Sequence, residues 1–127
     1  MTVSAFLMFD GHAEEAMKFY VSLFADGKIT RMNRYDDEGA EGSIMQSAFT
    51  LNGQNFLCTD SNTKHAFTFT PAMSIFVDCA IAAEIDRLTA ALSESGKTFM
   101  PLNNYGFSRK SAWVEDRFGV SWQLNLL

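Results

Sequence analysis

The sequence contains one pattern twice, and this internal repeat restricts its possible folds more than any other feature. The first copy begins at Phe6 and reads FLMFDGHAEEAMKFYVSLFADGKIT, and the second begins at Ser74 and reads SIFVDCAIAAEIDRLTAALSESGKTF. Each copy runs from an apolar stretch through an acidic turn and an amphipathic stretch to a Gly-Lys pair. We therefore expect the same supersecondary unit to occur twice.

Each copy has apolar residues at helical spacing, which predicts one amphipathic helix per copy. Asp10 and Asp78 precede these stretches, where a carboxylate can accept hydrogen bonds from the first N–H groups of a helix. Gly27 and Gly96 follow them, where a helix often ends in a left-handed residue. The apolar stripes consist of Ala13, Ala16, Met17, Tyr20 and Phe24 in the first copy, and of Ile81, Ile85, Leu88 and Leu92 in the second.

The remainder of each copy is typical of strands joined by hairpins. Asn52-Gly53 is a strong signal for a two-residue turn, and it pairs residues 47–51 with residues 54–58. Phe49 then faces Phe56 on the side of the helix, and Ala48 faces Leu57 on the other side.

A second hairpin is expected around the turn at residues 116–119, which pairs residues 111–115 with residues 120–124. This register makes Trp113 face Trp122 beneath the helix, and it makes Ala112 face Gln123 on the opposite side of the sheet.

Strand alternation assigns an uncharged mixture of polar and apolar side chains to the sheet face away from the helices. This face suits a sheet that curves around a ligand-binding cleft, although a partly solvated face or a dimer surface would show the same pattern. Its expected members are Ser4, Phe6, Met8, Thr50, Asn55, Leu57, Thr59, Ser74, Phe76, Ser121, Gln123 and Asn125.

The repeat and its strands predict an α+β fold in a single domain that spans residues 1–127. Two pseudo-symmetric βαβββ modules are expected, module one at about 1–65 and module two at about 66–127. Their strands should form an open, curved, mixed sheet around a cleft, with the helices on the convex face.

Composition narrows the classes of function. Hydrophobic residues make up 47% of the chain, enough for a packed core, and the net charge of -5 argues against nucleic-acid binding. The N-terminal MTVSAFLMFDG is neither a signal peptide nor a membrane span, so a cytoplasmic protein without a membrane partner is expected. In that compartment Cys58 and Cys79 are expected to be reduced thiols.

Two stretches resemble the vicinal oxygen chelate superfamily, which includes glyoxalase I, extradiol dioxygenases and bleomycin-resistance proteins. They are FDGHAEEAMKFY at residues 9–20 and YGFSRKSAWVEDRFGVSWQLNL at residues 105–126. The second resembles the PhnB-like branch, which is named for 3-demethylubiquinone-9 3-methyltransferase. The resemblance spans nearly the whole chain and implies paired βαβββ modules, an open U-shaped sheet and a homodimer.

In metal-dependent members of the superfamily, His, Gln and Glu ligands come from the first and last strands of each module. The resemblance places these positions at Ser4 or Ala5, Ala72, Leu57 and Gln123, of which only Gln123 could coordinate a metal. Because a catalytic divalent site needs about three imidazole or carboxylate ligands, no metal is expected. No glycine-rich loop for S-adenosylmethionine is present either, so no cofactor is expected.

Several other residues are tempting as functional groups but have simpler interpretations. His12 and His65 have no second histidine or acidic partner at ligand spacing, and Cys58 and Cys79 are expected to be buried structural thiols. The acidic stretch Asp36, Asp37, Glu38 and Glu41, with Gly39 and Gly42, does not match a calcium loop and is expected to be a solvated turn.

Arginine and tyrosine residues offer the clearest polar candidates for a ligand, because a guanidinium group can hold an anion by two hydrogen bonds. Surface charge and loop packing are the favoured explanation for these residues, and a ligand contact is the second. The polar candidates are Arg31, Arg34, Tyr35, Tyr105 and Arg109, and an apolar segment with Phe67, Phe69 and Met73 could line a cleft, meet a dimer partner or pack in the core.

Three functions remain open from the sequence. The leading hypothesis is a metal-independent protein that binds a small molecule in the cleft, since that face offers hydrogen bonds but no titratable group. The alternative is an enzyme whose catalytic groups come from loops or from a partner subunit, with the candidates Arg31, Arg34, Asp60, Tyr105 and Arg109. The third hypothesis is a structural dimer that binds no ligand. The candidate ligand-contacting residues are Phe6, Met8, Asn55, Leu57, Ser74, Phe76, Gln123, Asn125, Arg31, Tyr105 and Arg109.

Overall fold

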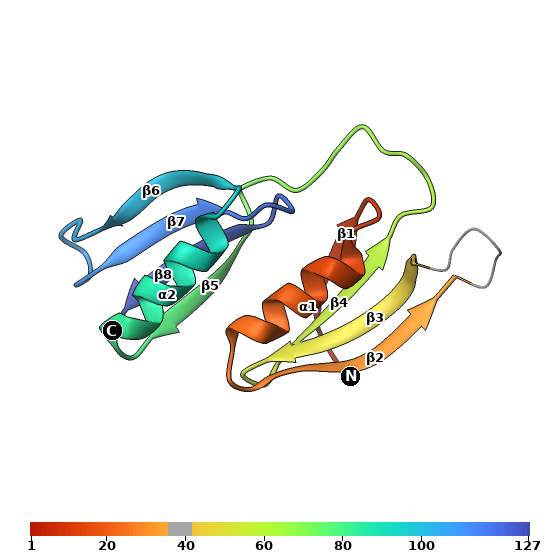
Figure 1. Ribbon diagram of the computed structural model, residues 1–127, viewed down its shortest axis with the longest axis horizontal. Helices are drawn as coiled ribbons and strands as arrows, with labels where there is room; N and C mark the ends of the chain where they lie inside the picture. Colours follow the sequence, from red (N-terminus) through yellow and green to blue (C-terminus); the bar gives the residue numbers. More distant parts are fainter. Residues whose placement is uncertain (36–41) are drawn as a thin grey trace. The chain divides into compact units, whose positions relative to one another are not determined.

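A computed structural model of the chain describes residues 1–35 and 42–127. The chain divides into two compact units, Met1–Ala66 and Phe67–Leu127. Within the described residues, each unit contains one helix and one four-stranded mixed sheet (Figure 1). The acidic residues Asp36, Asp37, Glu38 and Glu41 lie outside the described part of the chain.

Unit one has the order βαβββ, and its strands lie side by side in the order β1-β4-β3-β2. Strand β1 runs parallel to β4, and the other neighbours are antiparallel. Its elements are β1 (Ala5–Phe9), α1 (Ala13–Leu23), β2 (Gly27–Arg34), β3 (Ile44–Leu51) and β4 (Gln54–Asp60).

Unit two repeats this order, with its strands arranged as β5-β8-β7-β6 and with β5 parallel to β8. The predicted α+β class and the two βαβββ modules are therefore confirmed. The elements of unit two are β5 (Ser74–Cys79), α2 (Ala82–Ser93), β6 (Lys97–Asn103), β7 (Ser111–Glu115) and β8 (Ser121–Leu126).

The core of unit one lies between α1 and one face of its sheet. Tyr20 is fully buried, and its ring centroid lies 6.1 Å from that of Phe49. Phe49 stacks on Phe56 at 5.1 Å, and the two residues are direct cross-strand partners, as predicted. Burial of such a side chain contributes about 1.5–3 kcal/mol, so this aromatic column is a main source of stability in unit one.

The turn between β3 and β4 forms as the sequence predicts. Asn52 has φ 49° and Gly53 has φ 85°, the pair of positive values that a tight two-residue hairpin turn requires. Ala48 accordingly pairs with Leu57 on the face away from α1.

The predicted register of the second hairpin is wrong by one residue. Glu115 pairs with Ser121, so Val120 belongs to the loop and Trp113 pairs with Gln123 instead of Trp122. Because a shift of one residue moves every side chain to the other face, Trp113 leaves the helix side of the sheet. Only Trp122 lies in the core beneath α2, with 0% exposure.

Asp116 is the physical reason for this register. Its carboxylate accepts hydrogen bonds from the N–H groups of Phe118 and Val120 at 2.8 and 3.1 Å, which closes the loop after five residues. The second oxygen accepts a hydrogen bond from the indole N–H of Trp122 at 2.8 Å. Asp116 is 2% exposed, so its carboxylate is buried.

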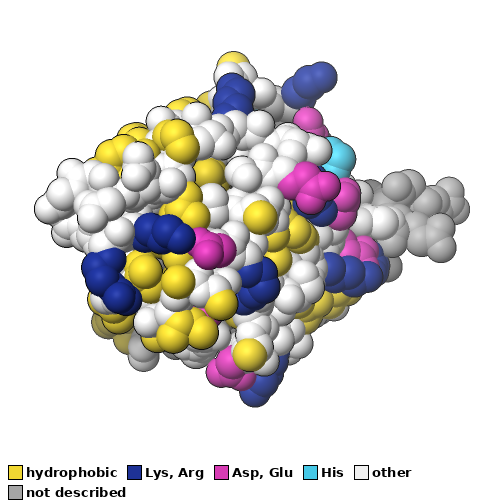
Figure 2. Space-filling model, turned by 60° about the vertical axis from the view of Figure 1, so that its left-hand side comes forward, with side chains coloured by type: hydrophobic (Ala, Val, Ile, Leu, Met, Phe, Trp, Pro, Cys, Tyr) yellow, Lys and Arg dark blue, Asp and Glu magenta, His cyan; other side chains and the backbone are white. Residues whose placement is uncertain are grey.

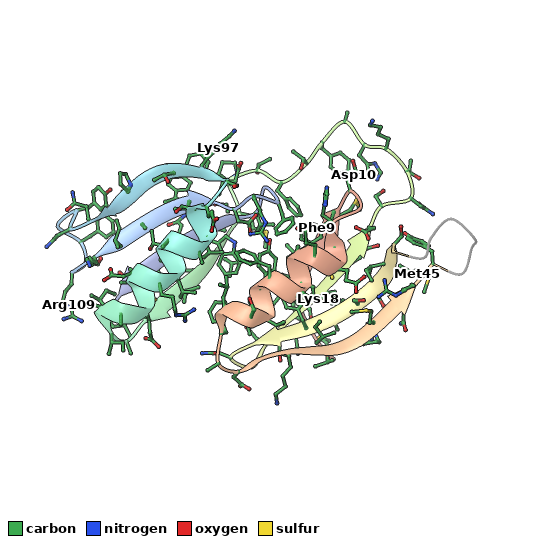
Figure 3. The ribbon with its side chains drawn as sticks, in the orientation of Figure 1. Phe9, Asp10, Lys18, Met45, Lys97 and Arg109 are labelled. Carbon is green, nitrogen blue, oxygen red and sulfur yellow. The ribbon has the colours of Figure 1, made fainter. Side chains whose placement is uncertain are left out.

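The helix starts differ from the prediction as well. Asp60, at the end of β4, accepts a hydrogen bond from the N–H of Ala13 at 2.9 Å, and Asp10 is exposed in the turn before α1 (Figure 3). At α2, Glu84 reaches back to the N–H groups of Ala80 and Ile81. A carboxylate stabilises each helix start, but it comes from a later residue than the sequence suggested.

Gly27 and Gly96 do not adopt the left-handed conformation that we expected. Neither has a positive φ, whereas Ser95 has φ 60°. They are needed for close approach instead, since a Cβ on Gly27 would lie 2.2 Å from the carbonyl oxygen of Val21 and one on Gly96 would lie 2.0 Å from that of Glu115.

We expect Gly27→Ala and Gly96→Ala each to lower the free energy of unfolding by about 1–3 kcal/mol, because the added methyl group overlaps backbone atoms. Urea unfolding followed by circular dichroism measures this change. Gly42→Ala is the matched control, because a Cβ there meets nothing within 4 Å. Equal midpoints for all three variants would contradict the close approach.

Candidate functional site

The open face of each sheet, defined as the face turned away from its helix, holds most of the predicted ligand-contacting residues. In unit two, direct pairing places Ser74 beside Ser121, Phe76 beside Gln123 and Asp78 beside Asn125. The alternate residues of β8, including Trp122 and Leu124, point into the core and are buried. The open face of unit two therefore carries the side chains of Ser74, Phe76, Gln123 and Asn125, as predicted from strand alternation.

A hydrogen-bonded group, the hydroxyl–indole cluster, occupies the centre of this face. It consists of Ser74, Ser121, Trp113 and Gln123. The two serine hydroxyl oxygens lie 2.7 Å apart, and the indole N–H of Trp113 donates to Ser121 Oγ at 2.9 Å. The amide of Gln123 donates to Ser74 Oγ at 3.4 Å. Ser121 is 1% exposed, whereas the other three members are half-buried.

Aromatic rings border the cluster. The ring of Phe99 lies 5.1 Å from that of Trp113 at a tilt of 51°, and Phe76 is the cross-strand partner of Gln123. Phe99 remains 40% exposed and Phe76 60% exposed. Figure 2 shows hydrophobic side chains reaching the surface among charged ones on the side that it views. Polar groups flanked by exposed rings are typical of a surface that binds a small molecule.

This face is not free of charge, contrary to the prediction. Asp78 accepts a hydrogen bond from the side-chain amide of Asn125 at 2.8 Å, which fixes it on the open face. Glu115 pairs with Ser121 on one side and with Lys97 on the other. The expected role of Asp78 at the start of α2 misplaced its carboxylate, and the wrong hairpin register misplaced Glu115.

The open face of unit one is more apolar. Its central row follows the pairs Phe6 with Leu57, Leu57 with Ala48, and Ala48 with Arg31. Phe6 is 54% exposed and Met8 is 39% exposed, and Asn55 pairs with Thr50 in the next row. The guanidinium of Arg31 donates to the amide oxygen of Gln46 at 3.0 Å, which places this cation at the end of the apolar row.

Within each unit, the polar loop candidates hydrogen-bond to parts of the fold. Asp60 is 2% exposed and holds the N–H groups of Ala13 and Ile44, and its carbonyl oxygen accepts a hydrogen bond from Tyr35. Tyr105 donates to the carbonyl oxygen of Pro101. Arg109, which follows β6 at the end opposite Lys97 in Figure 3, donates to the backbone oxygen of Leu127.

The cysteines are buried, as expected, whereas His12 has an acidic neighbour that the sequence analysis did not expect, since its Nδ1 lies 3.7 Å from a carboxylate oxygen of Glu15. His12 is an exposed residue at the start of α1, and His65 lies 2.9 Å from the hydroxyl of Ser61 in a loop. Both cysteines are buried and unbridged. Burial, assisted by the charge of Asp60, raises the pKa of Cys58 to about 12, which keeps the thiol protonated and unreactive.

The linker candidates separate into two kinds. Phe67 is 68% exposed and Met73 is 71% exposed, so neither packs in a core. Phe69 is half-buried.

The residues present do not fit the metal that the fold implies. At the expected ligand positions Ser4, Ala5, Ala72 and Leu57 supply no imidazole or carboxylate, and the amide of Gln123 is engaged with Ser74. Among residues 1–35 and 42–127, no three His, Cys, Asp or Glu side chains come together as a metal site.

In the same part of the chain, no helix is long and apolar enough to cross a membrane.

Sequence reasoning missed Trp113, Phe99 and Glu115 as members of this surface. The positions of Trp113 and Glu115 depend on the loop between β7 and β8, where Asp116 is followed by Gly119 with φ 92°, whereas Phe99 lies on β6 at a register irregularity against β7. An aspartate whose side chain can accept a hydrogen bond from the backbone N–H two residues later commonly forms a turn. That signal could have indicated a five-residue loop and hence the correct face for Trp113.

Comparisons with known proteins agree with this architecture. The family model described as 3-demethylubiquinone-9 3-methyltransferase matches residues 1–125. The PhnB protein of Bacillus cereus is 50% identical, with a TM-score of 0.96 and complete coverage of both chains. A Pseudomonas aeruginosa protein is 24% identical, with a TM-score of 0.86, and the match covers 99% of this chain and 97% of that one.

A more distant structure places the fold in a wider group. A glyoxylase/bleomycin resistance protein/dioxygenase domain from Frankia is 14% identical, with a TM-score of 0.70, over 99% of this chain and 96% of that one. No curated protein matches the chain.

One candidate, Arg34, serves the stability of unit one. Both of its terminal nitrogens donate to the carboxylate of Glu14 on α1, at 2.7 and 2.9 Å, and Lys18 lies 2.8 Å from the same carboxylate. Hydrogen bonds from Arg34, and then from Lys18, lower the pKa of Glu14 from 4.5 to about 2.

This pKa shift predicts a pH-dependent stability. Because the folded pKa of Glu14 is depressed, its contribution is complete above pH 4.5 and is lost as the pH falls towards about 2. We expect Glu14→Gln to be less stable than the wild type at pH 7, with the difference shrinking over that range. Urea unfolding at a series of pH values measures it. Glu94→Gln, at an exposed position, is the control, and a difference that is constant with pH would contradict the assignment.

Proposed function

This chain belongs to the 3-demethylubiquinone-9 3-methyltransferase family, which has the glyoxalase and bleomycin-resistance fold, and from that premise we propose that it binds a small molecule without a metal. The ligand contacts the open face of unit two at the hydroxyl–indole cluster. The homodimer and the cytoplasmic location expected from the sequence belong to the same proposal.

The cluster itself is the observation that carries this proposal. The repeat provides an internal comparison, because unit one builds the same βαβββ unit around different residues. Phe6 of β1 pairs with Leu57, whereas Ser74 of β5 pairs with Ser121. Since the fold forms in unit one without such a cluster, folding alone does not require it in unit two. Polar groups on a half-buried face that folding does not require support a role in recognition.

Binding without a metal follows from the donor set. A divalent cation of the kind used in catalysis needs about three imidazole or carboxylate ligands. The four implied positions provide one neutral amide, which already donates to Ser74. Methyl transfer finds no support either, since the turn between β1 and α1 contains a single glycine, Gly11, and no glycine-rich loop for a nucleotide-like cofactor.

An enzyme with loop-borne catalytic groups is a weaker alternative. Arg34, Asp60 and Arg109 each hold structural partners, namely Glu14, the start of α1 and the backbone of Leu127. A general acid or base must reach its substrate to transfer a proton, and these groups are occupied within the fold. Catalytic groups supplied by a partner subunit would restore this alternative. Enzymatic turnover that is lost in Tyr105→Phe or Arg109→Ala would support it.

We expect a ligand at this site to change the fluorescence of Trp113 and not that of Trp122, because Trp113 lies on the open face and Trp122 is buried. A metabolite that raises the melting temperature should quench the emission of the wild type. In Trp113→Phe, a saturating concentration of the same metabolite should leave the remaining Trp122 emission unchanged. Quenching that persists in Trp113→Phe would place the ligand elsewhere.

We also expect the untagged protein, dialysed without a chelator, to contain less than about a tenth of a divalent ion per chain, because a single amide oxygen cannot hold one. Mass spectrometry of the metal content measures this ratio. About one ion per chain would contradict the metal-free proposal and would favour oxygenase-like or glyoxalase-like chemistry.

A further inference from the structure

The hydrogen bonds of the hydroxyl–indole cluster have a direction that can be deduced. An indole N–H is a donor only, so Ser121 Oγ must accept the hydrogen bond from Trp113. The hydroxyl proton of Ser121 is buried, since this residue is 1% exposed. The acceptor within reach of that proton is Ser74 Oγ at 2.7 Å. Because a buried hydroxyl proton without an acceptor is costly, Ser121 donates to Ser74.

This direction leaves Ser74 as a donor at the surface. Its oxygen accepts from Ser121 and, at 3.4 Å, from the amide of Gln123. The hydroxyl proton of Ser74 is therefore not used within the cluster, and Ser74 is half-buried on the open face. A half-buried donor that points its proton away from its own partners is suited to a hydrogen-bond acceptor on a ligand.

The charges around the cluster restrict the ligand further. Asp78 lies in register beyond Phe76 on β5, and Glu115 is the direct partner of Ser121. Lys97, the partner of Glu115 on the opposite side, supplies one positive charge against these two carboxylates. The face is thus slightly negative, which disfavours an anionic ligand next to Ser74.

The aromatic residues define the shape of the ligand. Trp113 and Phe99 form a tilted pair on the β6–β7 side of the cluster, and Phe76 adjoins Gln123 on the β5 side. Both phenylalanine rings retain substantial exposure. A flat ring can pack against such side chains while it presents a polar atom to the cluster.

We infer that the ligand is an uncharged, flat molecule with a carbonyl or ring-nitrogen acceptor that receives the hydrogen bond of Ser74. Ser121 is a positioning residue, because it aims the hydroxyl of Ser74 by occupying its lone pair. This inference rests on the proposed function and adds the ligand class to it.

Nuclear magnetic resonance tests the inference through the indole N–H signals, of which the chain has two, from Trp113 and Trp122. The probes are acetophenone, benzoate and ethylbenzene, which share a benzene ring but carry a ketone, a carboxylate or no polar atom. Acetophenone should shift the Trp113 signal and bind about fivefold more tightly than ethylbenzene, the value of one hydrogen bond. Benzoate should bind more weakly than acetophenone, and the buried Trp122 signal should not move.

Variants separate the hydrogen bond from general packing. Ser74→Ala should reduce acetophenone binding about fivefold, to the level of ethylbenzene, and should leave ethylbenzene binding unchanged. Ser74→Thr keeps the hydroxyl group and should restore the preference. Ser93→Ala is the matched control, because it removes a serine hydroxyl from α2, on the other face of the same sheet, and should not alter binding.

The outcomes distinguish this inference from the proposed function. Equal binding of benzoate and acetophenone, or an unchanged preference in Ser74→Ala, would overturn the ligand class and leave the binding site in place. A Trp113 signal that no probe moves, while the Trp122 signal shows an intact fold, would overturn the site and the ligand class together.

Discussion

The buried carboxylate of Asp116 is the interaction on which the candidate site depends. By accepting hydrogen bonds from Phe118, Val120 and Trp122, it closes a five-residue loop and sets the register of β7 against β8. That register places one tryptophan in the core and the other on the open face. A loop one residue shorter would exchange the two faces of β7 and would separate Trp113 from Ser121.

The sequence was sufficient for the fold and insufficient for this site. Strong local signals, the duplicated helix pattern and Asn52-Gly53, correctly predicted two βαβββ units and the pairing of Phe49 with Phe56. Side chains that act at a distance along the chain were not predictable in this way. Asp60 stabilises the start of α1 from 47 residues away, a contact that no spacing rule in the sequence encodes. The open face of unit two was predicted correctly at Ser74 and Phe76 on β5 and along β8, where alternation suffices, and incorrectly at Asp78 and on β7.

The two copies also separate what folding requires from what recognition adds. Both copies keep a buried helix stripe and a glycine that allows backbone atoms to approach, and these are requirements of the βαβββ unit. The open faces have diverged, because β1 and β4 offer Phe6 and Leu57 where β5 and β8 offer serine hydroxyls and Gln123. A duplicated unit can therefore retain one surface for packing while the other surface acquires polar chemistry.

The order of strands has a consequence for solubility. In each sheet the outermost strands expose unpaired backbone groups, and natural proteins protect such edges with charged residues or proline. Strand β2 carries Lys28, Arg31 and Arg34, and β6 carries Lys97 and Pro101, so these two edges resist the addition of a foreign strand. Strand β1 reads AFLMF and has no such gatekeeper. Strand addition and the aggregation that follows from it are therefore expected to begin at the β1 edge of unit one and not at its β2 edge.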